Sequence, residues 1–346
     1  MSLLPPASHS SHGSRGALLP PPGRLVILGY EGLSPPDSLF AFAARHGLGG
    51  VILFARNCPD AATVAAATAA LRRGLAEADP GSPALVLVDQ EGGRVERLLE
   101  GVPLLPPART FGEDPRGETR LAEAVQAQAR ALAGLGITVN LAPVCDVAQQ
   151  GESGAIGDRS FGPNPERVAR LAAAHVRATL AGGVLPCAKH FPGHGAARAD
   201  SHRELPRVRR TLPELEALDL VPFRAAIAAG VPLVMAGHLF FPAVSASPVT
   251  LCRSWLQGVL RERMGFGGAV VSDDLEMGAL TGLGSPEDVA VRAVRAGCDL
   301  LIYGRMLQPG LDADAIAEAL SQGVPGDRRA QAEGRVQGLA EAPGSR

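Results

Sequence analysis

The segment KHFPGHGAARADSH, residues 189–202, gathers side chains that can do chemistry. One residue separates Asp200 from His202, a spacing that lets the carboxylate accept the imidazole N–H and raise the basicity of the ring. The same spacing also occurs in solvated turns. This segment, however, is long, follows an apolar run and has no periodic pattern, which is typical of loops that are functional or disordered. We therefore treat Asp200 and His202 as candidates for proton transfer.

Lys189 is the only lysine among the 33 Lys and Arg residues of the chain. One surface lysine that persisted by chance is the alternative explanation. Its polar neighbours favour instead a site where a compact ammonium cannot be exchanged for a planar guanidinium.

Asp273 ends the apolar run GGAVVSDD and is followed by a second aspartate. A carboxylate in line with a strand end can be a nucleophile, a general base or a metal ligand. Asp274 or Ser272 is expected to cap a following helix.

The segment VDQEGGRVERL also follows an apolar run and carries Asp89, Glu91, Arg94 and Arg97. Its two glycines let the backbone approach a ligand closely. Carboxylates beside guanidinium groups suit the recognition of sugar hydroxyls or of a carboxylate. A glycine turn with an exposed ion pair is an equal alternative for this segment alone.

A metal site is the less favoured interpretation of the histidines. His190, His194, His202 and His238 could bind zinc together with nearby aspartates. No HExxH motif occurs, and a Pro-Gly pair between His190 and His194 keeps them from sharing a helix face. We therefore expect no metal and no cofactor.

Eight short apolar runs alternate with stretches rich in alanine and leucine. The runs cover residues 24–29, 49–54, 84–89, 137–143, 184–191, 232–238, 268–274 and 299–304. The expected helices include residues 60–78, 117–134, 165–181, 212–229, 253–264 and 286–297. Near-continuous apolar runs are typical of parallel strands covered on both faces. Strand and helix repeated eight times predict an α/β protein with a single (β/α)₈ TIM-type barrel.

Polar residues follow most of these runs. They are Glu31, Arg56, Asn57, Asp89, Gln90, Glu91, Asn140, Asp146, Lys189, His190, His238, Asp273 and Asp274. In a barrel these positions surround one mouth, where the chemistry of this fold takes place. No GxGxxG or GxxxxGK[ST] follows the first run, which disfavours nucleotide-binding folds. Residues 24–340 are expected to form one catalytic domain, preceded by a disordered Pro/Ser/Gly-rich tail over 1–23.

The bulk composition excludes several classes of partner. The formal net charge is −2 without long runs of like charge, so we expect neither nucleic-acid nor membrane-surface binding. Five scattered cysteines without a CxxC motif fit a reducing compartment. The first residues lack the pattern of a secretory signal, and no apolar run reaches the ~18 residues of a membrane span. A cytoplasmic monomer is expected.

Taken together, several segments resemble the short, single-domain bacterial β-N-acetylhexosaminidases of glycoside hydrolase family 3. The likeness rests on KHFPGHG followed by DSH, together with VDQEGGRVERL, AIGDRSFGPNP, APVCDV, VMAGHLFFP and SDDL. It extends from about Gly29 to Leu301. The resemblance implies a single (β/α)₈ domain that removes terminal β-linked N-acetylglucosamine, with cell-wall muropeptides as substrate.

The resemblance also implies residue roles. Asp273 matches the catalytic nucleophile of a retaining glycosidase, His202 the general acid/base and Asp200 its partner. Residues that match those holding the non-reducing sugar are Asp89, Arg97, Arg159, Lys189 and His190. A histidine suits the proton-transfer role because its unperturbed pKa of about 6.5 lies near working pH. The loop that carries it is expected to close over the site.

Three alternatives stay open. Phosphate could replace water at the same covalent intermediate, which would make the enzyme a β-N-acetylglucosaminide phosphorylase. A family 3 β-glucosidase lacks DSH and normally carries a further domain for its acid/base, which we do not expect here. A catalytically silent sugar-binding barrel is disfavoured because Asp273, Asp200 and His202 are all present.

Overall fold

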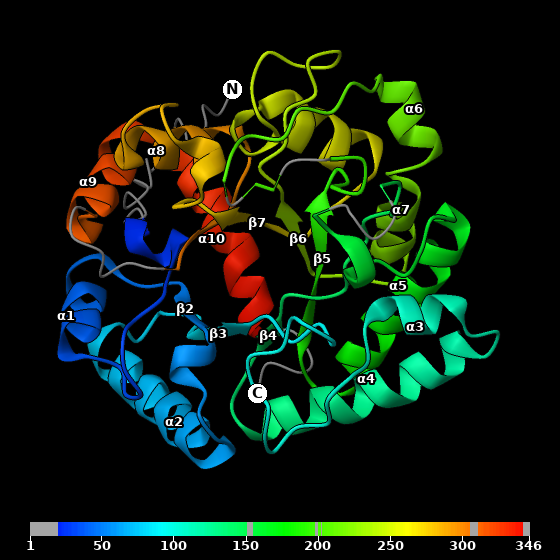
Figure 1. The fold of residues 1–346 in the computed structure, drawn as a ribbon. Coiled ribbons are helices and arrows are strands. Elements are labelled where there is room, and N and C mark those ends of the chain that lie inside the picture. Colours follow the sequence, from blue (N-terminus) through cyan, green and yellow to red (C-terminus); the bar gives the residue numbers. More distant parts are fainter. Residues whose placement is uncertain (1–19, 151–154, 198–199, 202, 305–310, 342–346) are drawn as a thin grey trace, which may run out of the picture.

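The computed structural model describes residues 20–150, 155–197, 200–201, 203–304 and 311–341. Within them, eight parallel strands form a closed barrel in chain order, and β1 pairs with both β2 and β8 (Figure 1). The strands are β1 (Val26–Leu28), β2 (Gly50–Leu53), β3 (Leu85–Val88), β4 (Val139–Asn140), β5 (Leu185–Phe191), β6 (Leu233–Ala236), β7 (Ala269–Asp274) and β8 (Leu300–Tyr303). Each lies within one of the eight apolar runs. The predicted (β/α)₈ barrel is confirmed.

Helices surround the barrel in the connections between strands. The α-helices are α1 (Asp37–His46), α2 (Ala61–Ala78), α3 (Ala108–Glu113), α4 (Gly117–Gly134), α5 (Pro165–Ala181), α6 (Leu212–Ala217), α7 (Val221–Ala228), α8 (Pro286–Ala296), α9 (Ala313–Gly323) and α10 (Gly326–Glu341). The other helical segments are η1 (Pro22–Leu25), η2 (Ala55–Asn57), η4 (Gly157–Arg159), η5 (Val249–Leu251), the π-helix η6 (Ser254–Arg263) and η7 (Gly278–Leu280). None of the described helices is both long and apolar enough to cross a membrane.

Local sequence explains where several helices begin. The side chains of Asp60, Asn164 and Ser285 each accept a main-chain N–H from the first turn of α2, α5 and α8, as expected for N-caps. The expected helix 212–229 is instead two helices, α6 and α7. Pro222 lies in the first turn of α7, where its missing N–H costs no helical hydrogen bond, so it favours a new start over continuation.

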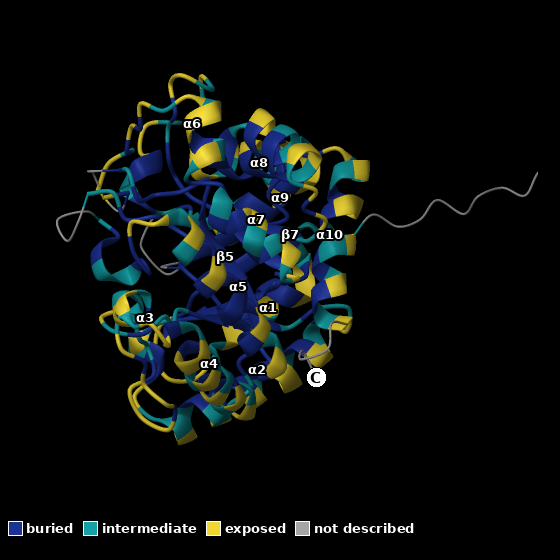
Figure 2. Cartoon of the chain, turned by 90° about the vertical axis from the view of Figure 1, so that its right-hand side faces the viewer, coloured by how far each residue is buried: buried dark blue, intermediate teal, exposed yellow. Residues whose placement is uncertain are grey.

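Apolar side chains fill both the barrel and the layer around it. Alternate residues such as Ile27, Leu87 and Leu233 point inward, where they pack with Val336 and Leu339 of α10. Their neighbours along the strands pack outward against the helices. The strands are accordingly buried, and exposed residues lie on the outer faces of the helices and in the loops (Figure 2). Burial on both faces explains why the strands read as continuous apolar runs.

One end of the barrel is closed by α10, which crosses the middle of the ring in Figure 1 and lies at its edge in Figure 2. Gly334 and Gly338 of α10 lie beside Pro232 and Gly268, where β6 and β7 begin. The opposite mouth, at the carboxyl ends of the strands, is therefore the end available to a ligand. Residues 1–19 of the expected tail lie outside the described residues, and Pro22 and Gly23 already belong to η1.

Candidate active site

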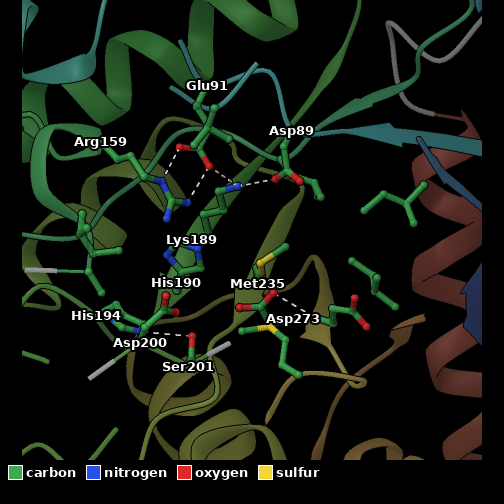
Figure 3. Close-up of a pocket in the computed structure, with 18 of the residues that line it drawn as sticks. Asp89, Glu91, Arg159, Lys189, His190, His194, Asp200, Ser201, Met235 and Asp273 are labelled. Carbon is green, nitrogen blue, oxygen red and sulfur yellow. Dashed lines mark hydrogen bonds and ion pairs between the residues drawn. The ribbon is translucent and has the colours of Figure 1, made fainter. Parts of the chain in front are cut away.

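A cavity of about 260 Å³ opens at the carboxyl ends of the strands (Figure 3). It is lined by residues of β2, β5, β6, β7 and β8 and of the loops that follow β2, β3, β4, β5 and β7. Of the predicted site residues, those that line it are Asp89, Arg97, Arg159, Lys189, His190, Asp200 and Asp273. His202, the predicted acid/base, lies outside the described residues. Segments up to about 180 residues apart in sequence thus meet at one cavity, as the barrel topology predicts.

A chain of five charged side chains forms one wall of the cavity. Nζ of Lys189 lies 2.6 Å from Oδ1 of Asp89 and 2.6 Å from Oε1 of Glu91. Glu91 in turn accepts two hydrogen bonds from Arg159, at 2.7 and 2.8 Å, and Asp89 accepts one from Arg97 at 3.3 Å. Three cations and two carboxylates alternate along this wall. Figure 3 shows Lys189 between Asp89 and Glu91, with Arg159 beside Glu91. The fork-like pair of Arg159 and Glu91 fixes both planes, and the wall can present donors and acceptors to sugar hydroxyls.

Lys189 is only 2% exposed although it carries a charge. Burial alone would lower its pKa, but Asp89 and Glu91 outweigh that effect and hold the pKa above its ordinary value. Burial would likewise raise the pKa of Glu91, but Arg159 and Lys189 lower it well below the usual range. Lys189 and Glu91 therefore both stay charged. The only lysine of the chain lies where a small ammonium is enclosed by two carboxylates, which supports the functional interpretation of that residue.

Gln90 positions the two carboxylates on either side of it. Its main-chain N–H donates to Asn140 Oδ1, and the Asn140 amide donates back to the Gln90 carbonyl. The buried Gln90 side chain also bonds the main chain of Arg97 and Leu98. Asp89 and Glu91 are thus held between β3, β4 and their own loop, so the GGRVER loop is fixed at both ends.

Asp273 lies at the end of β7 and faces the cavity. Burial would raise the pKa of its carboxyl, but His238, His190 and the Asp274 N–H outweigh this and lower the pKa below its ordinary value. That N–H lies 2.9 Å from Asp273 Oδ1. Asp273 is therefore an ionised carboxylate at neutral pH, the form that a nucleophile requires.

The expected helix cap after β7 is wrong. The strand continues through Asp274, whose Oδ1 accepts the N–H groups of Glu276 and Gly304. Ser272 Oγ instead accepts the N–H of Ile302 on the neighbouring β8. Both side chains join the end of β7 to its surroundings, and this tertiary pairing keeps the segment extended.

The loop beyond β5 is described on both sides of His202. Asp200 is exposed and lines the cavity, next to Ser201. His194 also lines the cavity, and its Nε2 lies 3.3 Å from Ser201 Oγ. His194 thus joins two parts of this loop. The geometry of the Asp200–His202 pair and the closure of the loop stay predictions.

Sequence reasoning placed Glu91, Asp146 and His238 at strand ends. It offered Glu91 for the recognition of sugar hydroxyls or a carboxylate and His238 as a possible zinc ligand, and it gave Asp146 no role. Glu91 belongs to the charged wall. His238 is fully buried, with Nδ1 2.8 Å from Thr250 Oγ1 and Nε2 3.0 Å from the Asp274 carbonyl, so it supports the end of β7. Asp146 bonds to His190. The sequence signal that these three residues share is a polar residue at or soon after the end of an apolar run. That pattern does not identify the groups that the side chain contacts.

The described residues do not support the metal-site interpretation. No group of three or more His, Cys, Asp or Glu side chains there is arranged to hold a metal ion. Of the histidines that suggested zinc in the sequence, His190 bonds to Asp146, His194 to Ser201 and His238 to Thr250.

Known proteins resemble this chain over most of its length. The glycosyl hydrolase family 3 N-terminal domain matches residues 34–339. A β-hexosaminidase of Thiobacillus denitrificans is 41% identical over 260 residues, which are 74% of this chain and 71% of that protein. A β-hexosaminidase of Xylella fastidiosa is 38% identical over 298 residues, 85% of this chain and 86% of that protein.

Two solved structures share the fold. A glycoside hydrolase family 3 β-N-acetylglucosaminidase from a Paenibacillus species has a TM-score of 0.85 and 36% identity. The match covers 94% of this chain but 62% of that one, less than two thirds of its length. NagZ from Neisseria gonorrhoeae has a TM-score of 0.75 and 31% identity, with 91% of this chain and 97% of that chain covered. With the cavity, its charged wall and the ionised Asp273, these matches show that the chain belongs to glycosyl hydrolase family 3 and is a glycoside hydrolase of the β-hexosaminidase type.

Proposed function

We propose that this protein is a retaining exo-β-N-acetylglucosaminidase that acts on muropeptides during cell-wall recycling. The observation that carries the proposal is the position of Asp273, an ionised carboxylate in the same cavity as the charged wall around Lys189. One group can react while the others hold the sugar. The cavity, at about 260 Å³, lies just below the ~300–1,000 Å³ of ordinary ligand pockets, which suits a single terminal sugar.

Binding comes first in the proposed reaction. Lys189, Arg97 and Arg159 offer N–H donors, and Asp89 offers acceptor oxygens, to the hydroxyl groups of the terminal sugar. These groups are already held by one another, so little ordering is needed when the sugar binds. Interactions with the ring hydroxyls can then support distortion of the sugar at its anomeric carbon.

Two displacements at the anomeric carbon follow. In the first, Asp273 forms a bond to that carbon, the glycosidic C–O bond breaks, and His202 gives its proton to the leaving oxygen. In the second, His202 takes a proton from water, the water oxygen bonds to the same carbon, and Asp273 leaves as a carboxylate. The anomeric configuration is retained. Asp200 would hold the His202 ring in its tautomer and stabilise the imidazolium.

The decisive experiment uses the purified full chain and an aryl N-acetyl-β-glucosaminide. Turnover with initial release of the β-anomer, seen by NMR, and a glycosyl adduct on Asp273, seen by mass spectrometry with a slow fluorinated substrate, are the expected results. Asp273→Asn is the matched control, since it keeps the shape and removes the nucleophile. An initial α-anomer, or an adduct elsewhere, would contradict the proposal.

Further experiments test the choice of water over phosphate, the substrate, the cellular location and the oligomeric state. Added phosphate that diverts the product to the sugar 1-phosphate would show phosphorolysis instead of hydrolysis. Muropeptides that carry terminal N-acetylglucosamine should be cleaved, and those with a free amine in place of the acetamide should not. Cell fractionation and size-exclusion chromatography test the proposed cytoplasmic location and monomeric state.

A further inference from the structure

Asp146, in the segment after β4, has a fully buried carboxylate that accepts hydrogen bonds from His190, near the end of β5, and from His194 in the loop that follows. Its Oδ1 lies 3.2 Å from the main-chain nitrogen of His190 and 2.6 Å from that of His194. Its Oδ2 lies 2.7 Å from Nδ1 of the His190 ring. In the described part of the chain, Asp146 is not among the residues that line the cavity. Its effect on the reaction must therefore pass through its two partners.

These contacts determine where the His190 ring carries its proton. A carboxylate oxygen accepts hydrogen bonds and has none to donate, so Nδ1 of His190 must be protonated to make the 2.7 Å contact. In the neutral ring this leaves Nε2 as an acceptor. His190 lines the cavity next to Lys189, whose ammonium is donor-only. A sugar hydroxyl donates as well as accepts, so the cavity needs acceptors beside its three cations.

We propose that Asp146 is a positioning residue of this glycosidase, which fixes the Nδ1–H tautomer of His190 so that Nε2 accepts a hydrogen bond from a substrate hydroxyl. The identity of that substrate rests on the proposed function. The same carboxylate anchors the first residues of the loop that carries Asp200, because it accepts the His194 N–H.

The surrounding backbone supports the second role. The segments 143–149 and 189–195 run side by side: Cys145 N–H donates to the Lys189 carbonyl at 2.6 Å, and Gln149 N–H to the Gly195 carbonyl at 3.2 Å. From His194 the connection continues through Ser201 Oγ, and the Ser201 carbonyl accepts the Ala279 N–H beyond β7. The Asp146 carboxylate thus connects the His190 imidazole to the loop that carries Asp200.

The substitution Asp146→Asn separates the two roles. The amide oxygen can replace Oδ1 and keep both main-chain N–H groups, whereas the amide nitrogen replaces Oδ2 and presents N–H to the ring. His190 must then carry its proton on Nε2, which turns the acceptor facing the substrate into a donor. Asp146→Ala, in contrast, removes both roles.

The tautomer is measured by NMR on the full chain labelled with ¹⁵N-histidine, and the His190 signals are assigned by their loss in His190→Gln. We expect the Nδ1–H form in the wild type and the Nε2–H form in Asp146→Asn. We also expect kcat/KM to fall about 10- to 100-fold, mainly through KM, as for one lost hydrogen bond to substrate. Hydrogen exchange of the 190–197 peptide should be unchanged in Asp146→Asn and faster in Asp146→Ala.

Asp219→Asn is the matched control. Asp219 is another buried carboxylate beside this loop, in contact with Gln149 and Arg210, but no hydrogen bond joins it to His190 in the described structure. It should leave the His190 tautomer as in the wild type. An Nε2–H ring in the wild type, or the same tautomer in Asp146→Asn as in the wild type, would overturn the inference. A tautomer switch in a protein without N-acetylglucosaminidase activity would support the inference and refute the proposed function, so the two failures are distinguishable.

Discussion

Nζ of Lys189 lies 2.6 Å from Oδ1 of Asp89, although 100 residues separate the two in the chain. The pair joins the end of β5 to the end of β3, across the intervening β4. Removing one partner of such a buried ion pair lowers the stability of the protein much more than replacing both partners with apolar residues, because it leaves an unpaired buried charge. Its members are therefore sensitive positions for both stability and activity.

The first prediction concerns the size of the cation at position 189. Lys189→Arg keeps the charge but places a planar guanidinium in a space that leaves the lysine 2% exposed between two carboxylates. We expect kcat/KM to fall at least about 100-fold and the protein to lose about 1–3 kcal/mol through overpacking. Steady-state kinetics and urea unfolding measure the two effects.

Arg120→Lys is the control for that exchange, because Arg120 is exposed on α4, 57% in its side chain, and its ion pair with Asp114 is a surface pair. We expect a change within about 0.5 kcal/mol and unchanged kinetics. Wild-type kcat/KM in Lys189→Arg would show that the site does not need a lysine.

The second prediction concerns Glu91 and the pH dependence of stability. Arg159 and Lys189, against the opposing effect of burial, hold the folded-state pKa of Glu91 below the unfolded value of 4.5. A carboxyl with a depressed pKa contributes its full stabilisation above the unfolded pKa and loses it as the pH falls toward the folded pKa. Glu91→Gln should cost about 3 kcal/mol at pH 7, and the difference should begin to shrink below pH 4.5. A difference in unfolding free energy that stays constant from pH 7 to pH 3 would contradict this account.

The third prediction concerns proton transfer by the loop. Asp200→Asn and His202→Ala should reduce turnover strongly when the leaving group is a sugar, because its oxygen must be protonated as the bond breaks. With an activated nitrophenyl leaving group the first step needs little protonation, so the loss should be at least 10-fold smaller. Asp273→Ala should abolish turnover of both substrates. Equal losses on the two substrates in His202→Ala would exclude it as the acid.

The fourth prediction concerns His175, which is buried in α5 with its Nδ1 3.1 Å from Thr179 Oγ1. Burial lowers its pKa from 6.5 to about 4. The unfolded chain therefore binds a proton at a higher pH than the folded one does, and stability falls as the pH drops from 6.5 to 4, by about 3 kcal/mol. His175→Gln should flatten this part of the profile of unfolding free energy against pH. An identical slope in the variant and the wild type would show that other groups cause the acid sensitivity.

The elements of the barrel could be predicted from the sequence because each has a local cause. Eight runs of mostly apolar residues each contain one strand, since parallel strands buried on both faces favour apolar residues at successive positions. Asp60, Asn164 and Ser285 predict the starts of helices, because each side chain accepts the main-chain N–H of the residue three positions later. The break between α6 and α7 was missed, because Pro222 decides it. The expected helix cap at Asp274 was wrong, because its carboxylate accepts the N–H groups of Glu276 and Gly304 instead.

The sequence by itself determined the fold class, the family and most of the residues around the cavity. Polar residues at strand ends converge in a closed barrel, so position along the chain is enough to place them at one mouth. Only the tertiary structure decided which partner each of them contacts there. It paired Lys189 with Asp89 and Glu91, gave Arg159 to Glu91, and set Asp146 behind His190. These partners come from different strands, and an ion pair or a tautomer depends on distances of a few ångströms that no spacing in the sequence encodes.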